Sequence, residues 1–364
     1  MIQQLVEIKN SYEILNQYIR KNQIQKIFLV CGKSSEGLPI GEHILSLRQE
    51  DKVEICCFQG FQSNPQYESV KKGVDAFLSS KADCIMAIGG GSAMDVAKCI
   101  KAFATLDQHI DFLQQSIEYN DIPFIAVPTT AGTGSEATHF AVIYHNGEKL
   151  SIAHQGLIPN LVVLDSNNLK TLPLYQRQVT MLDALCHAIE ACWSVNATIE
   201  SEEYAKIAIK LFVQYYKDYL SNEKIGNEMM LKAAYYAGKA INITKTTAAH
   251  AMSYKLTSVF GIAHGHAVAV CLSEVWEHLI MRCNVGTIAE KLQIIAAAMH
   301  CEDSNQALRL FRNILDENNL ILHKETKEET LDLLVTSVNV ERLNNHPIRL
   351  SIEELRALYT HILL

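Results

Sequence analysis

One carboxylate and three imidazoles are spaced so that they can act together as a metal site. Asp183 and His187 are four residues apart in a stretch of helical periodicity, so both face the same side of a helix. His250 and His264 follow among small and apolar residues, with His266 two residues beyond. One aspartate with three histidines suits a divalent transition metal such as Fe²⁺ or Zn²⁺. A surface Asp–His pair with separate, hydrogen-bonded histidines is the alternative, and the spacing alone leaves both interpretations open.

A glycine-rich segment follows a short apolar run and opens a helical pattern, Gly89-Gly-Gly-Ser-Ala-Met-Asp-Val-Ala-Lys98. Three glycines let the backbone approach a ligand closely, and Ser92 can cap the helix whose first N–H groups would face a phosphate. The segment is not the G-x-G-x-x-G fingerprint. An ordinary tight turn from strand to helix is therefore the alternative.

A second polar segment, Pro128-Thr-Thr-Ala-Gly-Thr-Gly-Ser-Glu136, directly follows another apolar run. Its four hydroxyl groups and two glycines suit a phosphate, a ribose or an amide. An ordinary polar loop is the alternative. Two such loops after neighbouring strands favour a dinucleotide, because open α/β sheets bind ligands at the carboxyl ends of their strands.

The elements that must position these loops are short apolar runs alternating with helical patterns. The expected strands are 26–31, 53–58, 84–88, 124–127 and 161–164. Stretches of helical period such as 67–78 and 93–104 separate most of them. This alternation predicts a parallel sheet wrapped by helices. One exception is the pair 139–145 and 149–153, joined across Asn146-Gly147, which predicts a β-hairpin.

Helical periodicity dominates from about residue 174 onward, for example over 202–220 and 229–241. Proline and glycine concentrate before it: six of the seven prolines lie at or before Pro173, and twelve of the seventeen glycines precede residue 157. The fold class is therefore α/β plus all-α. We expect a dinucleotide-binding α/β domain over 1–165 and a helical, metal-binding domain over 166–364.

The composition excludes several classes of protein. The chain has 364 residues, 48% hydrophobic and 20% charged, which is enough to bury a large core and excludes wholesale disorder. Its formal net charge of −8 argues against a nucleic-acid partner. The longest strongly apolar stretch, 294–299, is far shorter than the ~20 residues that cross a bilayer, and no secretory signal is visible at the start. Ten cysteines without a C-x-x-C pair indicate buried free thiols, so we expect a cytoplasmic protein.

Taken together, these segments resemble the iron-containing (group III) alcohol dehydrogenases. The likeness runs from about residue 24 to the last helices. The matching motifs are Gly89-Gly-Gly-Ser-x-x-Asp95-x-x-Lys98, Pro128-Thr-Thr-Ala-Gly-Thr-Gly-Ser-Glu136, Asp183-x-x-x-His187-x-x-Glu190-Ala, His250-Ala and Gly261-Ile-x-His264-Gly. The resemblance implies a Rossmann-like dinucleotide-binding domain and a C-terminal helical domain, a dehydroquinate synthase-like architecture with the site in the cleft between them.

The resemblance also implies roles for individual residues. Asp183, His187, His250 and His264 would bind one divalent metal, Fe²⁺ or Zn²⁺. The cofactor would be NADP(H) or NAD(H), bound by Gly89, Gly90, Gly91, Ser92, Asp95, Thr129, Thr130, Thr133, Ser135 and Lys149. A metal with an open position acts as a Lewis acid on the oxygen of a small alcohol or aldehyde, while hydride moves to or from the nicotinamide.

The chain departs from the commoner family pattern in two places. Many relatives have a second histidine four residues after the third metal ligand, where this chain has Tyr254. We name as catalytic residues Tyr254, which can hydrogen-bond the substrate, and His266, a second candidate for the proton relay. Helix packing is the alternative role for Tyr254.

The second departure lies at the end of the first predicted strand, where relatives that prefer NAD often carry an aspartate. This chain has Cys31-Gly32-Lys33-Ser34-Ser35 there. No carboxylate in these five residues repels a 2′-phosphate, and Lys33, Ser34 and Ser35 can bind one. The segment favours NADP(H) and leaves NAD(H) open.

The run from Lys245 to Thr257, with His264-Gly-His266, is most similar to the branch that reduces phosphonoacetaldehyde to 2-hydroxyethylphosphonate. Cations and hydroxyl donors suit a small dianionic head group, and such a group can be surrounded here by Lys245, Thr246, Thr247, Lys255 and His266. The alternative is that both lysines are solvated on a helix surface.

Two other functions stay open at this stage. A sugar-phosphate cyclase of the dehydroquinate synthase type shares the architecture, the NAD and the metal but performs elimination and ring closure, so net consumption of NAD(P)H would distinguish it. A non-catalytic nucleotide-binding protein is the other, and the complete ligand set argues against it. We expect a small aldehyde or alcohol as the partner, with no nucleic acid and no membrane, and a homodimer.

Overall fold

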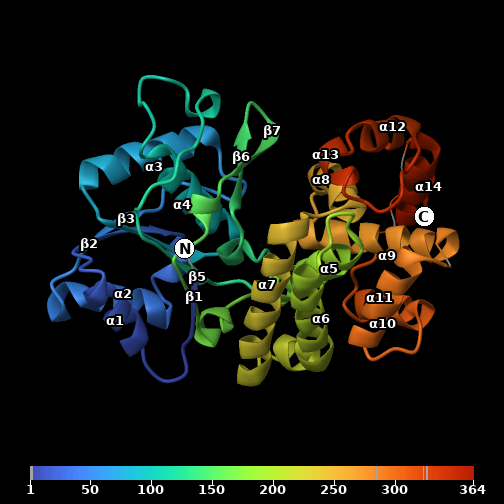
Figure 1. Cartoon of the computed structure of the whole chain (residues 1–364), viewed down its shortest axis with the longest axis horizontal. Coiled ribbons are helices and arrows are strands. Elements are labelled where there is room, and N and C mark those ends of the chain that lie inside the picture. The colour runs from blue at the N-terminus through green and yellow to red at the C-terminus, as the bar shows by residue number, and fades with distance from the viewer. Residues whose placement is uncertain (1–2, 284, 323, 325–326) are drawn as a thin grey trace. The chain divides into compact units, whose positions relative to one another are not determined.

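The computed structural model describes residues 3–283, 285–322, 324 and 327–364. It divides into two compact units, Met1–Leu172 and Pro173–Leu364, and each is described by itself (Figure 1). Among the described residues no helix combines the length and the apolar character that a membrane span needs. The ten cysteines are free thiols as predicted, but the predicted burial holds for only six of them, and Cys57 is exposed.

A six-stranded parallel sheet forms the centre of the first unit. Its strands are β1 (Gln4–Glu7), β2 (Lys26–Cys31), β3 (Glu54–Phe58), β4 (Cys84–Gly89), β5 (Phe124–Pro128) and β8 (Leu161–Leu164). Their order in the sheet is β1-β8-β5-β4-β2-β3, and all neighbouring pairs are parallel. The four inner strands are almost wholly buried, as expected where helices cover both faces of a parallel sheet.

Helices cover the two faces of this sheet (Figure 1). They are α1 (Glu13–Lys21), α2 (Pro39–Glu50), α3 (Tyr67–Ser80) and α4 (Gly91–Phe103). Leu15 of α1 and Leu29 of β2 belong to one buried core on the face that α1 and α2 cover. On the other face, Phe28 of β2 meets Phe77 of α3 edge to face, with 5.4 Å between ring centroids. Successive side chains of β2 therefore point to opposite faces of the sheet, and the strand contributes to the packing on both.

The predicted hairpin is present as β6 (Phe140–His145) and β7 (Glu148–Ala153), an antiparallel pair. Asn146 and Gly147 form its turn with φ angles of 51° and 81°, the positive values that this turn requires. The five predicted strands are also confirmed, with ends that differ by at most one residue. Only β1 among the described strands was not predicted. None of its four residues is fully buried, so it carries little apolar signal.

All the regular elements among the described residues of the second unit are helices, as predicted. Its helices are α5 (Leu174–Trp193), α6 (Ile199–Leu220), α7 (Lys224–Thr244), α8 (Ala248–Phe260), α9 (His264–Arg282), α10 (Thr287–Ala298), α11 (Ser304–Glu317), α12 (Glu328–Thr336), α13 (Val340–Leu343) and α14 (Ile352–Leu363). Most of α5 is buried, because α6, α7, α9 and α10 pack around it. This burial explains why polar side chains on α5 need partners from other helices.

Along the chain, the boundary between the two units falls between Leu172 and Pro173, whereas the predicted boundary followed residue 165. The segment after β8 belongs to the first unit because its polar groups bond there. The Tyr12 hydroxyl donates to Asp165, whose other carboxylate oxygen caps the short helix η5 (Ser166–Leu169). The Asn168 amide donates to the carbonyl oxygen of Pro128, 3.4 Å away.

Candidate metal centre and dinucleotide loops

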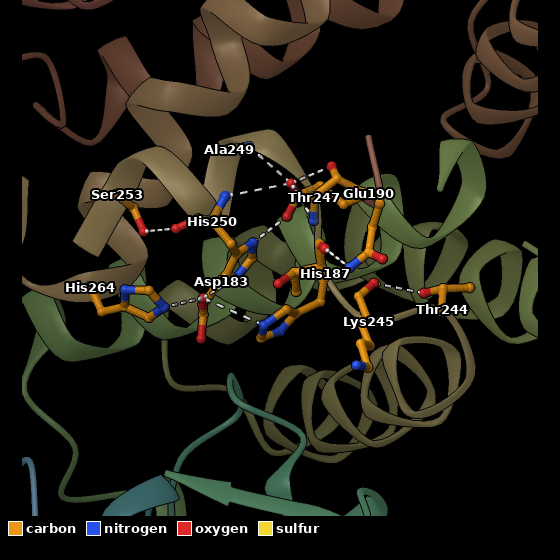
Figure 2. Close-up of polar contacts among 12 residues, drawn as sticks. Asp183, His187, Glu190, Thr244, Lys245, Thr247, Ala249, His250, Ser253 and His264 are labelled. Atoms are coloured by element: carbon orange, nitrogen blue, oxygen red, sulfur yellow. Dashed lines mark hydrogen bonds and ion pairs between the residues drawn. The ribbon is translucent and has the colours of Figure 1, made fainter. Parts of the chain in front are cut away.

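The four predicted metal ligands converge in the second unit (Figure 2). Asp183 and His187 lie on α5, four residues apart, while His250 lies in the first turn of α8 and His264 is the first residue of α9. From Asp183 Oδ1, the Nε2 atoms of these three histidines lie 4.0, 3.5 and 4.0 Å away, in chain order. The spacing of four thus places Asp183 and His187 on one face of α5, as predicted. The helices α8 and α9 supply the other two ligands.

The donor set fits a divalent transition metal. Bonds of 2.0–2.1 Å in a tetrahedral site place ligand atoms roughly 3.4 Å apart, close to the separations in this cluster. Asp183, His187 and His250 are buried, and their ligand atoms lie within 4.8 Å of one another. His264 differs, because 37% of its side chain is exposed. A metal held here would therefore have one accessible side, next to His264.

The charges in the cluster favour an ionised aspartate. Burial by itself raises the pKa of Asp183, but the imidazoles of His187, His250 and His264 outweigh it and hold that pKa well below its usual range. Burial likewise lowers the pKa of His250, yet Glu190 and Asp183 together raise it to about 9. Since a metal ligand must be deprotonated, metal binding at His250 displaces a proton.

Glu190 is a functional residue to which the sequence gave no role. It lies on α5, fully buried, and one carboxylate oxygen accepts a hydrogen bond from His250 Nδ1. This contact keeps a proton on Nδ1, so that Nε2, which faces Asp183, is the nitrogen that gives up its proton when a metal binds. The signal in the sequence was its position three residues after His187, on the same face of the helix.

The second oxygen of Glu190 fixes the start of α8. It accepts from the Thr247 amide at 3.1 Å, from the Thr247 hydroxyl at 2.6 Å and from the Ala249 amide at 3.0 Å. The Trp193 indole donates to the same hydroxyl at 3.0 Å. One buried carboxylate therefore both orients a metal-binding histidine and satisfies the first N–H groups of the helix that carries it.

The two predicted catalytic residues have different surroundings. The Tyr254 ring stacks on His264, with 5.8 Å between centroids and 19° between planes, so Tyr254 lies beside the metal cluster. His266 is two residues after His264 on α9 and faces another way, since residues two apart on a helix do not share a face. Its Nδ1 lies 3.3 Å from the Tyr175 hydroxyl. The structure thus joins Tyr254 to the cluster and does not bring His266 to it.

The predicted substrate residues are also unlike one another. Lys245 pairs with Glu341, at 3.0 Å between Nζ and Oε1, and both side chains are largely exposed. Thr246 is buried, and its carbonyl oxygen accepts from the Asn345 amide at 3.0 Å. Lys255 is half-buried on α8, one residue after the tyrosine that stacks on the cluster.

In the first unit, the two predicted cofactor loops lie side by side. Gly89 at the end of β4 pairs with Pro128 at the end of β5, and the Thr129 amide donates to the Gly89 carbonyl at 3.0 Å. A Cβ atom on Gly91 would come within 2.9 Å of the Thr133 side chain, so only glycine allows this approach. The loops therefore form one surface at the carboxyl edge of the sheet.

The start of α4 differs from the prediction in one respect. Gly90 rather than Ser92 is the N-cap, and no side chain caps the helix. Ser92 lies inside the first turn, so the predicted cap is wrong. The first N–H groups of α4 consequently have no side-chain acceptor at the cap, an arrangement that suits a phosphate.

A buried lysine holds the second loop in place. Lys98 Nζ donates to Ser135 O at 2.6 Å, to the Thr138 hydroxyl at 2.8 Å and to Phe140 O at 2.8 Å. The Ser135 hydroxyl in turn donates to Asp95 at 3.0 Å. Two predicted cofactor residues, Asp95 and Ser135, are thus bonded to each other, and Lys98 is the centre of the network. Burial, the largest influence, lowers the pKa of Lys98 to about 8.

We expect Lys98→Met to lower the free energy of unfolding by about 3 kcal/mol, because methionine fills the space and leaves the buried acceptors of Ser135 and Thr138 and the partly buried Phe140 carbonyl without their donor. Urea denaturation followed by circular dichroism measures the change. Lys72→Ala, at an exposed position of α3, is the control and should change stability by less than about 0.5 kcal/mol. Equal stability of the two variants would contradict the role given to Lys98.

Two further predicted cofactor residues, Lys33 and Lys149, are exposed. Lys33 begins the short helix η1 (Lys33–Ser35) directly after β2. Lys149 lies on β7, opposite Tyr144. The Ser34 side chain lies outside the described part of the structure. The prediction for the ribose end of the cofactor therefore depends on Lys33.

Comparison with known protein families decides the classification. Residues 3–166 match the model described as iron-containing alcohol dehydrogenase, and residues 178–363 match the model of the C-terminal part of the Fe-containing alcohol dehydrogenase family. The chain belongs to the iron-containing alcohol dehydrogenase family. The predicted family, fold class and cofactor class, NAD(P) with a divalent metal, are confirmed, and the family does not favour the sugar-phosphate cyclase.

Individual members of the iron-containing alcohol dehydrogenase family are moderately similar to this chain. Aldehyde-alcohol dehydrogenase 2 of Entamoeba histolytica is 32% identical over 270 residues, which are 70% of this chain but only 31% of that protein. The phosphonoacetaldehyde reductase of Streptomyces viridochromogenes is 30% identical over 76% of this chain and 75% of its own length. The solved structure of an iron-containing alcohol dehydrogenase from Thermotoga maritima superposes with a TM-score of 0.86 at 25% identity, covering 100% of this chain and 98% of that one.

Proposed function

We propose that this protein is a metal-dependent, NAD(P)-linked alcohol dehydrogenase or aldehyde reductase. The main support is the convergence of three imidazole Nε2 atoms on Asp183 Oδ1 within 4.0 Å, in a chain of this family. The proposed reaction is hydride transfer between nicotinamide and the carbon of a small alcohol or aldehyde. The cytoplasmic location and the homodimer stay predictions from the sequence.

In this proposal the residues of the cluster hold the metal and orient the substrate. Asp183, His187, His250 and His264 would bind the ion, which when bound supplies Lewis acidity toward a substrate oxygen. His264 is the most exposed of the four, so the substrate approaches beside it and beside Tyr254. Burial raises the pKa of Tyr254 to about 12, so its hydroxyl keeps its proton at neutral pH and can donate a hydrogen bond to the substrate.

The loops of the first unit would hold the cofactor. The first N–H groups of α4 suit the pyrophosphate, because a helix N-terminus favours a negative charge. The hydroxyls of Thr129, Thr130 and Thr133 add donors on the adjoining loop. Lys98 positions Ser135 and so keeps the second loop against the first.

Phosphonoacetaldehyde is the substrate that we propose, with 2-hydroxyethylphosphonate as its product. The support is the 30% identity with a phosphonoacetaldehyde reductase over three quarters of both chains, together with cationic and hydroxyl side chains near Tyr254. Other relatives that match over less of their length act on neutral alcohols by name, so the choice of substrate needs a direct comparison.

The test is oxidation of NADPH at 340 nm by the full chain reconstituted with Fe²⁺ or Zn²⁺, with phosphonoacetaldehyde and propionaldehyde as parallel substrates. A kcat/KM at least tenfold higher for the phosphonate supports the proposed substrate. Efficient turnover of propionaldehyde without that preference refutes the substrate and keeps the dehydrogenase. No turnover of either refutes the proposed activity.

The coenzyme preference gives a separate prediction. We expect Lys33→Ala to lower kcat/KM for NADPH by roughly tenfold and to change that for NADH by less than twofold, because only NADPH carries a 2′-phosphate for the lysine to bind. Lys72→Ala removes an exposed lysine elsewhere in the same unit and should affect neither coenzyme. An equal loss of kcat/KM with both coenzymes would show that Lys33 does not bind the 2′-phosphate.

A further inference from the structure

The helix α13 is fastened beside the start of α8 by hydrogen bonds on both sides of it. The Asn339 amide donates to Ala251 O at 3.3 Å, and the Asn345 side-chain amide donates to Thr246 O at 3.0 Å. These residues are far apart in the sequence, and the bonds fix α13 against the segment that carries the predicted substrate residues. The side chains of α13 that face α8 are therefore held beside the segment 246–251, which includes the predicted metal ligand His250.

Arg342 is such a side chain, and it reaches Tyr254. It is half-buried, and its guanidinium, like the Thr246 hydroxyl, donates a hydrogen bond to the Tyr254 hydroxyl. The ring of Tyr254 stacks on His264, as described above. A permanent cation is thereby held one side chain away from a metal-binding imidazole. The sequence gave no reason to select it, because Arg342 and Tyr254 belong to separate helices.

The surroundings of Arg342 distinguish it from Lys245. The Lys245 side chain is 45% exposed and its ammonium is paired with Glu341, so water screens its charge and the pair contributes little. Arg342 is partly withdrawn from water, where a charge attracts an anion more strongly. Glu190, the buried carboxylate of this region, is already bonded to His250 and Thr247.

We propose that Arg342, with the hydroxyl of Tyr254, binds the phosphonate head group of an aldehyde whose carbonyl lies at the metal cluster. A guanidinium has five N–H donors in a planar fork, so it can hold Tyr254 and anionic oxygens at the same time. The inference rests on the proposed reductase function. It makes Arg342, in place of Lys245, the main cation for substrate selection.

The test compares Arg342→Gln with the wild-type enzyme, both loaded with Zn²⁺, on phosphonoacetaldehyde and on propionaldehyde. The ratio of the two kcat/KM values should fall by roughly 10- to 150-fold, the loss expected for a hydrogen bond to a charged group. Inhibition by ethylphosphonate, an anion that cannot be reduced, should weaken by a similar factor. Arg349→Gln, at an exposed position beyond α13, should leave the ratio and the inhibition unchanged.

Two outcomes would overturn the inference. An unchanged ratio in Arg342→Gln would show that the guanidinium does not select the anion. An equal loss with both aldehydes would show that Arg342 acts only by positioning Tyr254. If Arg342→Gln does not fold, Arg342→Lys decides the question, because lysine keeps the charge but loses the fork. The inference requires a lower ratio in that variant too, and an unchanged ratio refutes it.

Direct binding separates this inference from the proposed function. Calorimetric titration of the zinc-loaded chain with ethylphosphonate needs no turnover. Binding that Arg342→Gln abolishes, in an enzyme that reduces no aldehyde, would support the anion subsite and refute the proposed activity. Reduction of propionaldehyde by an enzyme that neither binds ethylphosphonate nor prefers the phosphonate would support the activity and refute the subsite.

Discussion

Replacing His187 with alanine is expected to lower kcat/KM for aldehyde reduction by about 1000-fold and to reduce the bound metal below one ion per chain. His187 is buried, and its Nε2 lies 4.0 Å from Asp183 Oδ1, within the cluster. The Lewis acidity of a bound metal stabilises the transition state by several kcal/mol, and about 4 kcal/mol corresponds to three powers of ten in rate. Alanine removes a ligand without adding bulk, so the cluster keeps its shape but binds the ion more weakly.

Metal analysis after dialysis and the NADPH assay measure the two effects on the same sample. His361→Ala is the matched control, because His361 lies on α14 with 61% of its side chain exposed and outside the cluster. It should retain activity within about twofold, as surface substitutions usually do. Full metal content and activity in His187→Ala would mean that the four residues are not the metal site.

Much of the first unit could be predicted because its signals are local. The strand β2 consists of the half-buried Lys26 and five buried apolar residues, and its predicted bounds match the structure. The hairpin depends on two adjacent residues, Asn146 and Gly147, whose backbone preferences fix the turn. The predicted N-cap of α4 was wrong because the local signal is ambiguous. Both Gly90 and Ser92 suit an N-cap, and the sequence does not say which residue starts the helix.

The parts of the site that escaped prediction depend on contacts between distant segments. Glu190 and its partner His250 are 60 residues apart, and nothing in either segment indicates that the carboxylate meets that ring. Lys245 and Glu341 are 96 residues apart, so an apparently available cation is in fact paired. Periodicity places residues on one face of a helix, but it does not show which helices pack together. The metal ligands were identified through the family motif, which records that packing indirectly.

Glu190 gives the second large prediction, a metal affinity that is weaker by about 10- to 100-fold in Glu190→Gln. The glutamine oxygen can still accept from Thr247 and Ala249, but its NH₂ group then faces His250 Nδ1. Two donors cannot bond, so the ring proton moves to Nε2, the atom that must bind the metal. If the amide turns the other way, its NH₂ group opposes the N–H groups at the start of α8. Either orientation disturbs His250.

The measurement is competition for Co²⁺ with a chelator of known affinity, read from the visible absorption of the bound ion. Co²⁺ absorption reports the ligands themselves, so a change in its bands separates a misoriented His250 from a general loss of stability. Glu317→Gln, at the exposed end of α11, is the matched control and should bind Co²⁺ like the wild type. Glu190→Asp keeps the charge but is one methylene shorter, so it cannot span His250 and Thr247 together and should also bind more weakly.

A normal affinity and an unchanged Co²⁺ spectrum in Glu190→Gln, with only a lower unfolding temperature, would assign Glu190 to the support of α8 alone. The geometry argues against that outcome, because the two oxygens of this buried carboxylate serve different partners. One accepts from the helix start and the other from the imidazole. Since His250 lies two residues after the first residue of α8, the same carboxylate sets both where the helix begins and where its metal-binding nitrogen points.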